Sequence, residues 1–213
     1  MAQPKIEFKS RELQEGRNYL QQLIGNVAVM GSGGSLSYDF PLTAPSGRGM
    51  TPSLGLVYSS SAEMSEYGYG WDLTLPMLER NSAEGVPQFD DSDVFQYRQG
   101  FDRRPLVATG EITADGWAVF REETERTFSR YLLKSNSWRI LSLDGKRLEL
   151  GTGSDSRRGR GTRSVLADTA AWMPKRSIDT HGNFIVYEYW SDRVGQSSVY
   201  VVSILSCGKM VCS

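Results

Sequence analysis

Apolar side chains recur at every second position in several stretches after residue 26, and this period of two constrains the fold more than any other feature. In SLSYDFPL (35–42), Leu36, Tyr38 and Phe40 share one face and alternate with polar residues. PSLGLVYSS (52–60) repeats the alternation, and the Pro- and Gly-containing segment 44–52 before it has the composition of a turn. Because strand side chains alternate between the faces of a sheet, the two stretches predict an antiparallel pair of half-buried strands.

Two stretches in the second half carry turn-forming pairs between alternating runs. WRILSLDGKRLELG (138–151) holds Asp144-Gly145, and WMPKRSIDTHGNFIVYEYW (172–190) holds Gly182-Asn183. Such pairs supply the positive φ angles of a two-residue hairpin turn, so each stretch predicts a hairpin. Both faces of 184–190 carry apolar or aromatic residues, and we expect both to be covered. SSVYVVSIL (197–205) predicts a further strand.

These patterns predict an all-β fold of consecutive antiparallel hairpins that form curved sheets. Helical spacing occurs over 10–24, where Gly16 interrupts it, so we expect at most one short N-terminal helix. The string GTGSDSRRGRGTR (151–163) has no apolar residue and predicts an exposed loop.

The segment YGYGWDLTLP (67–76) alternates aromatic rings with glycines and continues into an apolar alternation. We expect Gly68 and Gly70 to turn the backbone tightly, while Tyr67, Tyr69 and Trp71 anchor a corner between two strands. Aromatic rings bury large areas, and packing is therefore a better interpretation here than a platform for sugars or bases.

Length and charge narrow the classes of function. The 213 residues suit one domain or two small ones. The 24 Lys and Arg residues nearly balance the 25 Asp and Glu residues, so the net charge does not attract the chain to nucleic acid or to an anionic membrane. The charged N-terminus lacks the apolar core of a Sec signal peptide, and no apolar run reaches the roughly twenty residues of a membrane span. With one histidine and two cysteines, a zinc site lacks ligands, and we predict no metal and no cofactor.

Several motifs, taken in order, resemble the N-terminal region of the SpvB family, which virulence plasmid protein B shares with the B components (TcB) of insecticidal toxin complexes. The resemblance begins with the strand pair of 34–62, YGYGWDL (67–73) and LPMLER (75–80). It continues through DDSDVFQY (90–97), FREETERTFSRYLL (120–133) and the two hairpins, and covers roughly 25–205. The residues singled out as a structural motif are Pro52, Tyr58, Gly68, Gly70, Trp71, Arg80, Trp138, Asp144, Gly145, Trp172, Asp179, Gly182 and Asn183.

The resemblance implies a non-enzymatic structural module of a secreted toxin or virulence protein, made in the cytoplasm and exported without a Sec signal. In toxin complexes the B and C components form a hollow shell, and B docks on a translocating A component, so C-type and A-type proteins are the implied partners. Family members are several-fold longer than this chain. We therefore expect a leader over 1–24, the β-rich domain over 25–205 and a truncated tail over 206–213, and a non-functional remnant is one alternative.

A second alternative is an ADP-ribosyltransferase fragment, because virulence plasmid protein B modifies actin through a C-terminal domain. Such enzymes carry an arginine, a Ser-Thr-Ser strand and a Glu-x-Glu pair, and Arg48, 59–61 (SSS) and 123–125 (ETE) occur in that order. Matches this short arise by chance, and the same stretches belong to the structural motifs, so we predict no catalytic residue.

Other candidate sites have simpler interpretations. GSGGS (31–35) lacks the Gly-Lys-Ser/Thr of a phosphate loop, so we expect a plain loop there. DDSD (90–93) lacks the glycine and the distal glutamate of a calcium loop, so we expect a solvated acidic turn. His181 lies in a predicted turn without an evident nucleophile. Cys207 and Cys212 suit a disulfide or two free thiols equally. The remaining candidate is a basic cluster, expected to be solvated, of Arg157, Arg158, Arg160 and Arg163.

Overall fold

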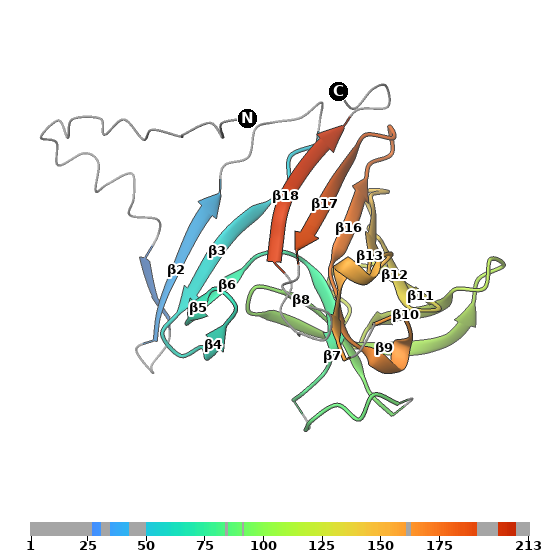
Figure 1. The fold of residues 1–213 in the computed structure, drawn as a ribbon, viewed down its shortest axis with the longest axis horizontal. Coiled ribbons are helices and arrows are strands. Elements are labelled where there is room, and N and C mark those ends of the chain that lie inside the picture. The colour runs from blue at the N-terminus through green and yellow to red at the C-terminus, as the bar shows by residue number, and fades with distance from the viewer. Residues whose placement is uncertain are drawn as a thin grey trace, which may run out of the picture.

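The structure, a computed structural model, describes residues 27–30, 35–42, 50–83, 85–90, 92–160, 163–190 and 200–207. Within these ranges all regular elements are β-strands apart from two short 3₁₀ turns, so the predicted all-β fold is confirmed (Figure 1). The expected helix over 10–24 lies outside the described residues.

The strands form three antiparallel sheets. The small sheet has the order β1 (Val27–Met30), β2 (Ser35–Leu42), β3 (Leu54–Ser59), β6 (Trp71–Leu73), and a two-stranded sheet pairs β4 (Met64–Ser65) with β5 (Gly68–Tyr69). The large sheet has the order β14 (Arg157–Gly159), β15 (Thr169–Trp172), β7 (Met77–Arg80), β8 (Phe95–Gln99), β9 (Asp102–Ile112), β10 (Ala118–Glu122), β11 (Arg130–Lys134), β12 (Ser137–Leu141), β13 (Arg147–Leu150), β16 (Pro174–Ile178), β17 (Phe184–Trp190), β18 (Tyr200–Cys207).

The large sheet closes on itself. β15 pairs with β7, and β16 pairs with β13, although Met173 alone separates β15 from β16 along the chain. The strands β7 to β13 and the continuous segment 169–178 therefore form a ring of antiparallel pairs. A ring of about eight strands leaves an interior just wide enough for side chains.

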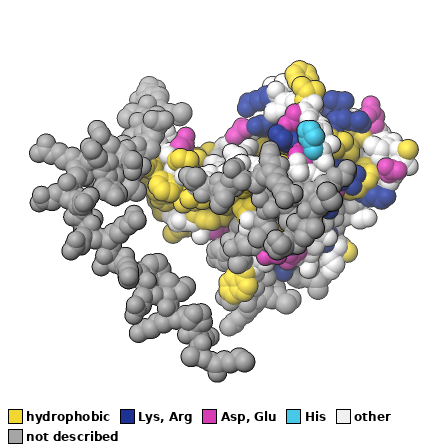
Figure 2. All heavy atoms as spheres, turned by 90° about the horizontal axis from the view of Figure 1, so that it is seen from above, with side chains coloured by type: hydrophobic (Ala, Val, Ile, Leu, Met, Phe, Trp, Pro, Cys, Tyr) yellow, Lys and Arg dark blue, Asp and Glu magenta, His cyan; other side chains and the backbone are white. Residues whose placement is uncertain are grey.

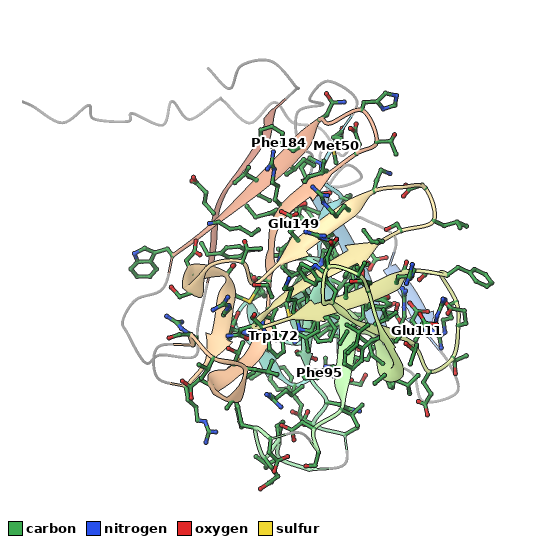
Figure 3. The ribbon with its side chains drawn as sticks, turned by 90° about the vertical axis from the view of Figure 1, so that its right-hand side faces the viewer. Met50, Phe95, Glu111, Glu149, Trp172 and Phe184 are labelled. Carbon is green, nitrogen blue, oxygen red and sulfur yellow. The ribbon has the colours of Figure 1, made fainter. Side chains whose placement is uncertain are left out.

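Aromatic side chains fill this ring. Trp138 on β12 lies 5.1 Å from Phe95 on β8 and 6.0 Å from Trp172 on β15, measured between ring centroids, although several strands separate these elements within the sheet. Figure 3 shows Phe95 and Trp172 together in the interior. Edge-to-face ring pairs at such distances each add about 1 kcal/mol to the stability that burial provides.

A second core joins the small sheet to β17 and β18, which extend the large sheet beyond the ring. Leu73 and Leu75 pack there with Ile185 and Tyr187, and Leu54, Leu56 and Ile204 contact this cluster. β2 and β3 pair as predicted, with Tyr38 opposite Tyr58. The face predicted for β2 is only partly covered, because Leu36 remains 39% exposed.

Three hairpin loops share one geometry. In 142–146 and 179–183 the first and last residues of the loop pair, and the glycine donates its N–H to the carbonyl of the first residue. Gly145 and Gly182 have φ of +81° and +85°, while Asp144 and Asn183 do not have positive φ. The hairpins are confirmed, but the loops contain three residues and one left-handed glycine rather than a two-residue turn. Residues 113–117 (TADGW) form the same loop, and this third hairpin was not among the predictions.

Two expectations about exposure are wrong. The stretch 151–163 contains a 3₁₀ turn (Ser154–Ser156) and β14, and Ser156, Arg157 and Arg163 are buried. Arg157 is buried because its guanidinium finds backbone acceptors, at 2.7 Å from the Gly151 oxygen and 2.9 Å from the Arg163 oxygen. In β17 one face is covered, but Glu188 and Trp190 on the other are exposed.

Candidate functional site

A charged cleft of about 820 Å³ opens beside the ring, between the β4–β5 hairpin and strands β6, β8, β9 and β14. Its charged lining residues balance in sign and are Glu63, Glu66, Asp72, Arg98, Arg103 and Arg158. Exposed Met64 and Tyr69, which face each other across β4 and β5, lie on the same hairpin.

Ion pairs cross this cleft and tie separate elements together. Arg98 on β8 pairs with Asp72 on β6 and, at 3.3 Å, with Glu79 on β7, while Arg158 on β14 pairs with Glu66. Burial alone would lower the pKa of Arg98, but the carboxylates of Glu79 and Asp72 outweigh it and raise that pKa. These pairs could not be predicted from the sequence, because their partners are separated by up to 92 positions.

The hydroxyl groups at the cleft serve the turns. Ser65 donates to the Trp71 carbonyl oxygen, and Ser61 bonds with Ser59 at 2.9 Å. Burial and the charge of Glu66 raise the pKa of the Tyr67 phenol to about 12. The ion pairs and the serine hydroxyls at the cleft thus hold the surrounding turns and strands together.

The glycine-aromatic segment forms one wall of this region. Gly68 and Gly70 have φ of +114° and +78°, and a Cβ at Gly70 would lie 2.6 Å from the Tyr58 ring. The Trp71 ring packs against Tyr58 and Tyr38 at 5.2 and 6.2 Å. Tyr69 does not anchor the corner as predicted: it is 65% exposed, because the tight turn directs it outward.

Arg80 is the centre of a buried network. Its Nη1 donates to Asp93 at 2.6 Å, its Nε to the Thr169 carbonyl at 2.9 Å, and its Nη2 to the Leu166 carbonyl at 2.8 Å. The expectation of a solvated acidic turn at 90–93 is therefore wrong for Asp93, whose side chain is 7% exposed. Although burial works against it, hydrogen bonds from Gln88, Phe89 and Arg80 lower the pKa of Asp93.

Glu122 is the centre of a second network, inside the FREETERTFSRYLL stretch. One carboxylate oxygen accepts from Tyr131 at 2.7 Å, Thr127 at 2.8 Å and Arg104 at 2.9 Å, and the other accepts from the Arg126 N–H at 2.9 Å. Its side chain is fully buried. A carboxylate with this many donors stabilises the fold and is not free to act as a base.

The remaining motif residues serve packing and turns. Trp172 donates from Nε1 to the Asn136 side chain at 2.8 Å, and Asp144 accepts from the Lys146 N–H at 3.1 Å. Asp179 accepts from the N–H groups of His181 and Asn183 and from the Asn183 amide, each at 2.8 Å. Pro52 is buried.

The serine and glutamate candidates for a transferase site lie in different sheets. Ser59 is the last residue of β3 in the small sheet, whereas 123–125 follow β10 in the large sheet, and Glu125 accepts from the Phe128 N–H at 2.8 Å. Arg48 lies outside the described residues, as do 31–34 and Cys212. His181 projects from its turn with a side chain that is 84% exposed.

The basic cluster divides by burial. Arg157 and Arg163 are buried, Arg158 pairs with Glu66, and Arg160 stacks on Phe89 at 3.9 Å.

No three His, Cys, Asp or Glu side chains in the described ranges are placed to hold a metal ion. Among the same residues, no helix is long and apolar enough to cross a membrane.

Comparison with known proteins identifies the family. The family model described as Salmonella virulence plasmid 65kDa B protein (SpvB) matches residues 30–199, so the chain belongs to the SpvB family. The mono(ADP-ribosyl)transferase SpvB of Salmonella typhimurium is 26% identical over 191 residues, which cover 79% of this chain and 32% of the relative. The chain thus spans about a third of the length of the curated relatives it matches.

Solved structures share the fold. The N-terminal domain of the effector SpvB from Salmonella typhimurium strain LT2 matches with a TM-score of 0.64 and 25% identity, over 79% of this chain and 62% of that one. A chain of the Photorhabdus luminescens Tc holotoxin pore matches with a TM-score of 0.72 and 25% identity, over 84% of this chain and 10% of that one. The similarity to the SpvB and TcB N-terminal region is therefore confirmed, and the similar proteins are toxins and effectors.

Proposed function

We propose that residues 25–205 are a non-catalytic structural module of a secreted toxin or virulence protein. The observation that carries this proposal is the use of the family-motif residues inside the fold. The glycines occupy left-handed turns, Trp138 and Trp172 fill the ring, and Arg80 and Asp179 hold loops through internal hydrogen bonds. Motif residues engaged in this way stabilise a scaffold.

The proposed role is part of the wall of a toxin shell, with C-type and A-type toxin components as partners. The match to a chain of a Tc holotoxin, of which this fold covers 10%, supports that role. A closed ring with a filled interior suits it as well, because a barrel packed with side chains resists deformation and leaves few open sheet edges.

A chimera tests the structural role. The matching segment of a Tc toxin B component would be replaced by residues 25–205 and co-expressed with its C-type component, and size-exclusion chromatography would measure the assembly. We expect one large B–C species. The chimera carrying Trp138→Ala is the matched control and should not yield it. A folded chimera that stays apart from the C component contradicts the proposal.

An NAD assay tests the absence of catalysis. The purified chain and its Glu125→Gln variant would be incubated with NAD, and nicotinamide release would be measured. We expect both to match buffer. Turnover by the unchanged chain that Glu125→Gln abolishes would establish the transferase alternative instead.

A further inference from the structure

The outer wall of the ring carries one arginine on each of four neighbouring strands. Ile140 on β12 and Leu148 on β13 point into the packed interior, so the residues beside them along the strands point outward. The same alternation applies on β11, where Tyr131 points inward, and on β16, where Ser177 pairs with Leu148. The outward residues form what we call the arginine face: Arg130, Arg139, Arg147 and Arg176.

Strand register arranges this face in two rows. In the first, Arg130 pairs with Leu141, Leu141 with Arg147, and Arg147 with Ile178. In the second, Arg139 pairs with Glu149, and Glu149 with Arg176. Arginines within a row are therefore two strands apart, about 10 Å, with a different side chain between them. Figure 3 shows Glu149 on β13 in this wall and Phe184 on β17, which continues the sheet beyond the ring.

The face has more positive charge than its carboxylates neutralise. Glu149 is shared between Arg147, at 3.2 Å, and Arg139, at 3.8 Å, while Glu111 lies 3.8 Å from Arg130. Two carboxylates thus serve four guanidinium groups. In Figure 2, Lys and Arg side chains gather around the histidine, at the end of the molecule where the β16–β17 turn lies.

The Nε–H groups of Arg130, Arg139 and Arg176 are buried and, within the described residues, have no hydrogen-bond acceptor, while the Arg147 Nε lies 3.2 Å from the Glu149 carboxylate without hydrogen-bond geometry. Buried donors in folded proteins almost always have an acceptor, because leaving one unpaired is unfavourable. The guanidinium ends remain accessible: the side chains of Arg130 and Arg147 are 43% and 41% exposed. A ligand that supplies oxygen acceptors can therefore reach the exposed guanidinium ends of this face, while the buried Nε–H groups lie beneath them.

Apolar groups between the arginines narrow the class of ligand. Leu141 and Ile178 are half-buried on the same wall. Phe184 is half-buried on the adjoining β17, opposite Ile178, and the Arg176 guanidinium stacks on its ring at 4.1 Å. At the edge of the face, a hollow of about 360 Å³ is lined by Trp117, Lys134, Arg139 and Glu149 among others. A phosphate backbone would leave these apolar groups uncovered, whereas a polypeptide can match both kinds of group.

We propose that the arginine face docks an extended acidic segment of a partner protein. Its Asp or Glu carboxylates accept from the guanidinium groups, and its apolar side chains cover Leu141 and Ile178. An extended chain places alternate side chains on one side about 7 Å apart, which suits a surface built on strands. This surface is separate from the charged cleft and from the packed interior that carries the proposed function.

Fluorescence anisotropy of labelled probes tests the proposal on the full chain. The probes are a twelve-residue peptide of alternating valine and glutamate, its valine–lysine counterpart, and an oligodeoxythymidylate of the same net charge. We expect the glutamate peptide to bind and the lysine peptide not to bind. Equal or tighter binding of the oligonucleotide would overturn the proposal in favour of a phosphate-binding surface.

Matched variants locate the binding. Arg139→Gln with Arg176→Gln should weaken the glutamate peptide about tenfold or more, because charge-assisted hydrogen bonds are lost, and Arg103→Gln at the cleft should change nothing. Glu149→Gln removes the internal competitor and should tighten binding severalfold, a gain that misfolding cannot mimic. Unchanged affinity in Glu149→Gln, or full binding when Arg139 and Arg176 are both glutamine, would overturn the proposal.

Discussion

The buried carboxylate of Glu122 makes the stability of this protein depend on pH in the acidic range. Burial by itself would raise its pKa, but hydrogen bonds from Tyr131, Arg104 and Thr127 outweigh burial and lower the pKa from 4.5 to about 2. The ionised form is thus favoured by folding. This contribution is fully present above pH 4.5, where the unfolded chain is also ionised, and it is lost as pH falls toward 2.

The size of the contribution follows from the two pKa values. Lowering a pKa from 4.5 to about 2 corresponds to about 3 kcal/mol of stability at neutral pH. Glu122→Gln removes the charge and leaves Arg104 with Asp102, 2.6 Å away, as its remaining carboxylate partner. We therefore expect the variant to lose about 3 kcal/mol at pH 7 and progressively less between pH 4.5 and pH 2.

Urea unfolding followed by tryptophan fluorescence measures this loss, because Trp138 and Trp172 are fully buried. Glu123→Gln is the matched control: its side chain is exposed, and the substitution should change the free energy of unfolding by less than about 0.5 kcal/mol. A Glu122→Gln loss that is equally large at pH 7 and near pH 2.5, or no larger than that of Glu123→Gln, would refute the reasoning.

Three other substitutions test the packing and the networks. Gly70→Ala places a Cβ 2.6 Å from the Tyr58 ring at a φ of +78° and should cost about 3 kcal/mol in urea unfolding, whereas Gly110→Ala, with the same φ and open space, should cost about 1 kcal/mol. Trp138→Ala should lower the free energy of unfolding by about 3–5 kcal/mol, whereas Trp190→Ala, at a side chain that is 54% exposed, should lower it by under about 1 kcal/mol. Equal losses would contradict the packed interior of the strand ring. Arg80→Gln leaves Asp93 buried without its cation and should lower the free energy of unfolding by about 3–5 kcal/mol, which thermal unfolding measures as a lower Tm; an unchanged Tm would contradict the network.

The candidate site was predictable only in part. Gly68, Gly70 and Trp71 could be placed at a tight corner, since a positive φ at glycine and the packing of a neighbouring ring are local properties. The ion pairs of the cleft could not be predicted: Arg158 and Glu66 are 92 positions apart, and nothing in either segment indicates the other. The prediction of a solvated acidic turn at 90–93 was wrong for the same reason. Arg80 contacts Asp93 only when β7 and β8 pair.

By itself, the sequence determined the strands and the hairpins. Alternation with a period of two and glycine in left-handed turns act over a few residues, so β12–β13 and β16–β17 follow from their own stretches. Ring closure was decided only by the tertiary structure, since β15 pairs with β7 across about ninety positions of chain. That pairing also buries Arg80, because it brings the Thr169 carbonyl within 2.9 Å of the Arg80 Nε. Burial depends on contacts between distant segments, and a local pattern carries no information about them.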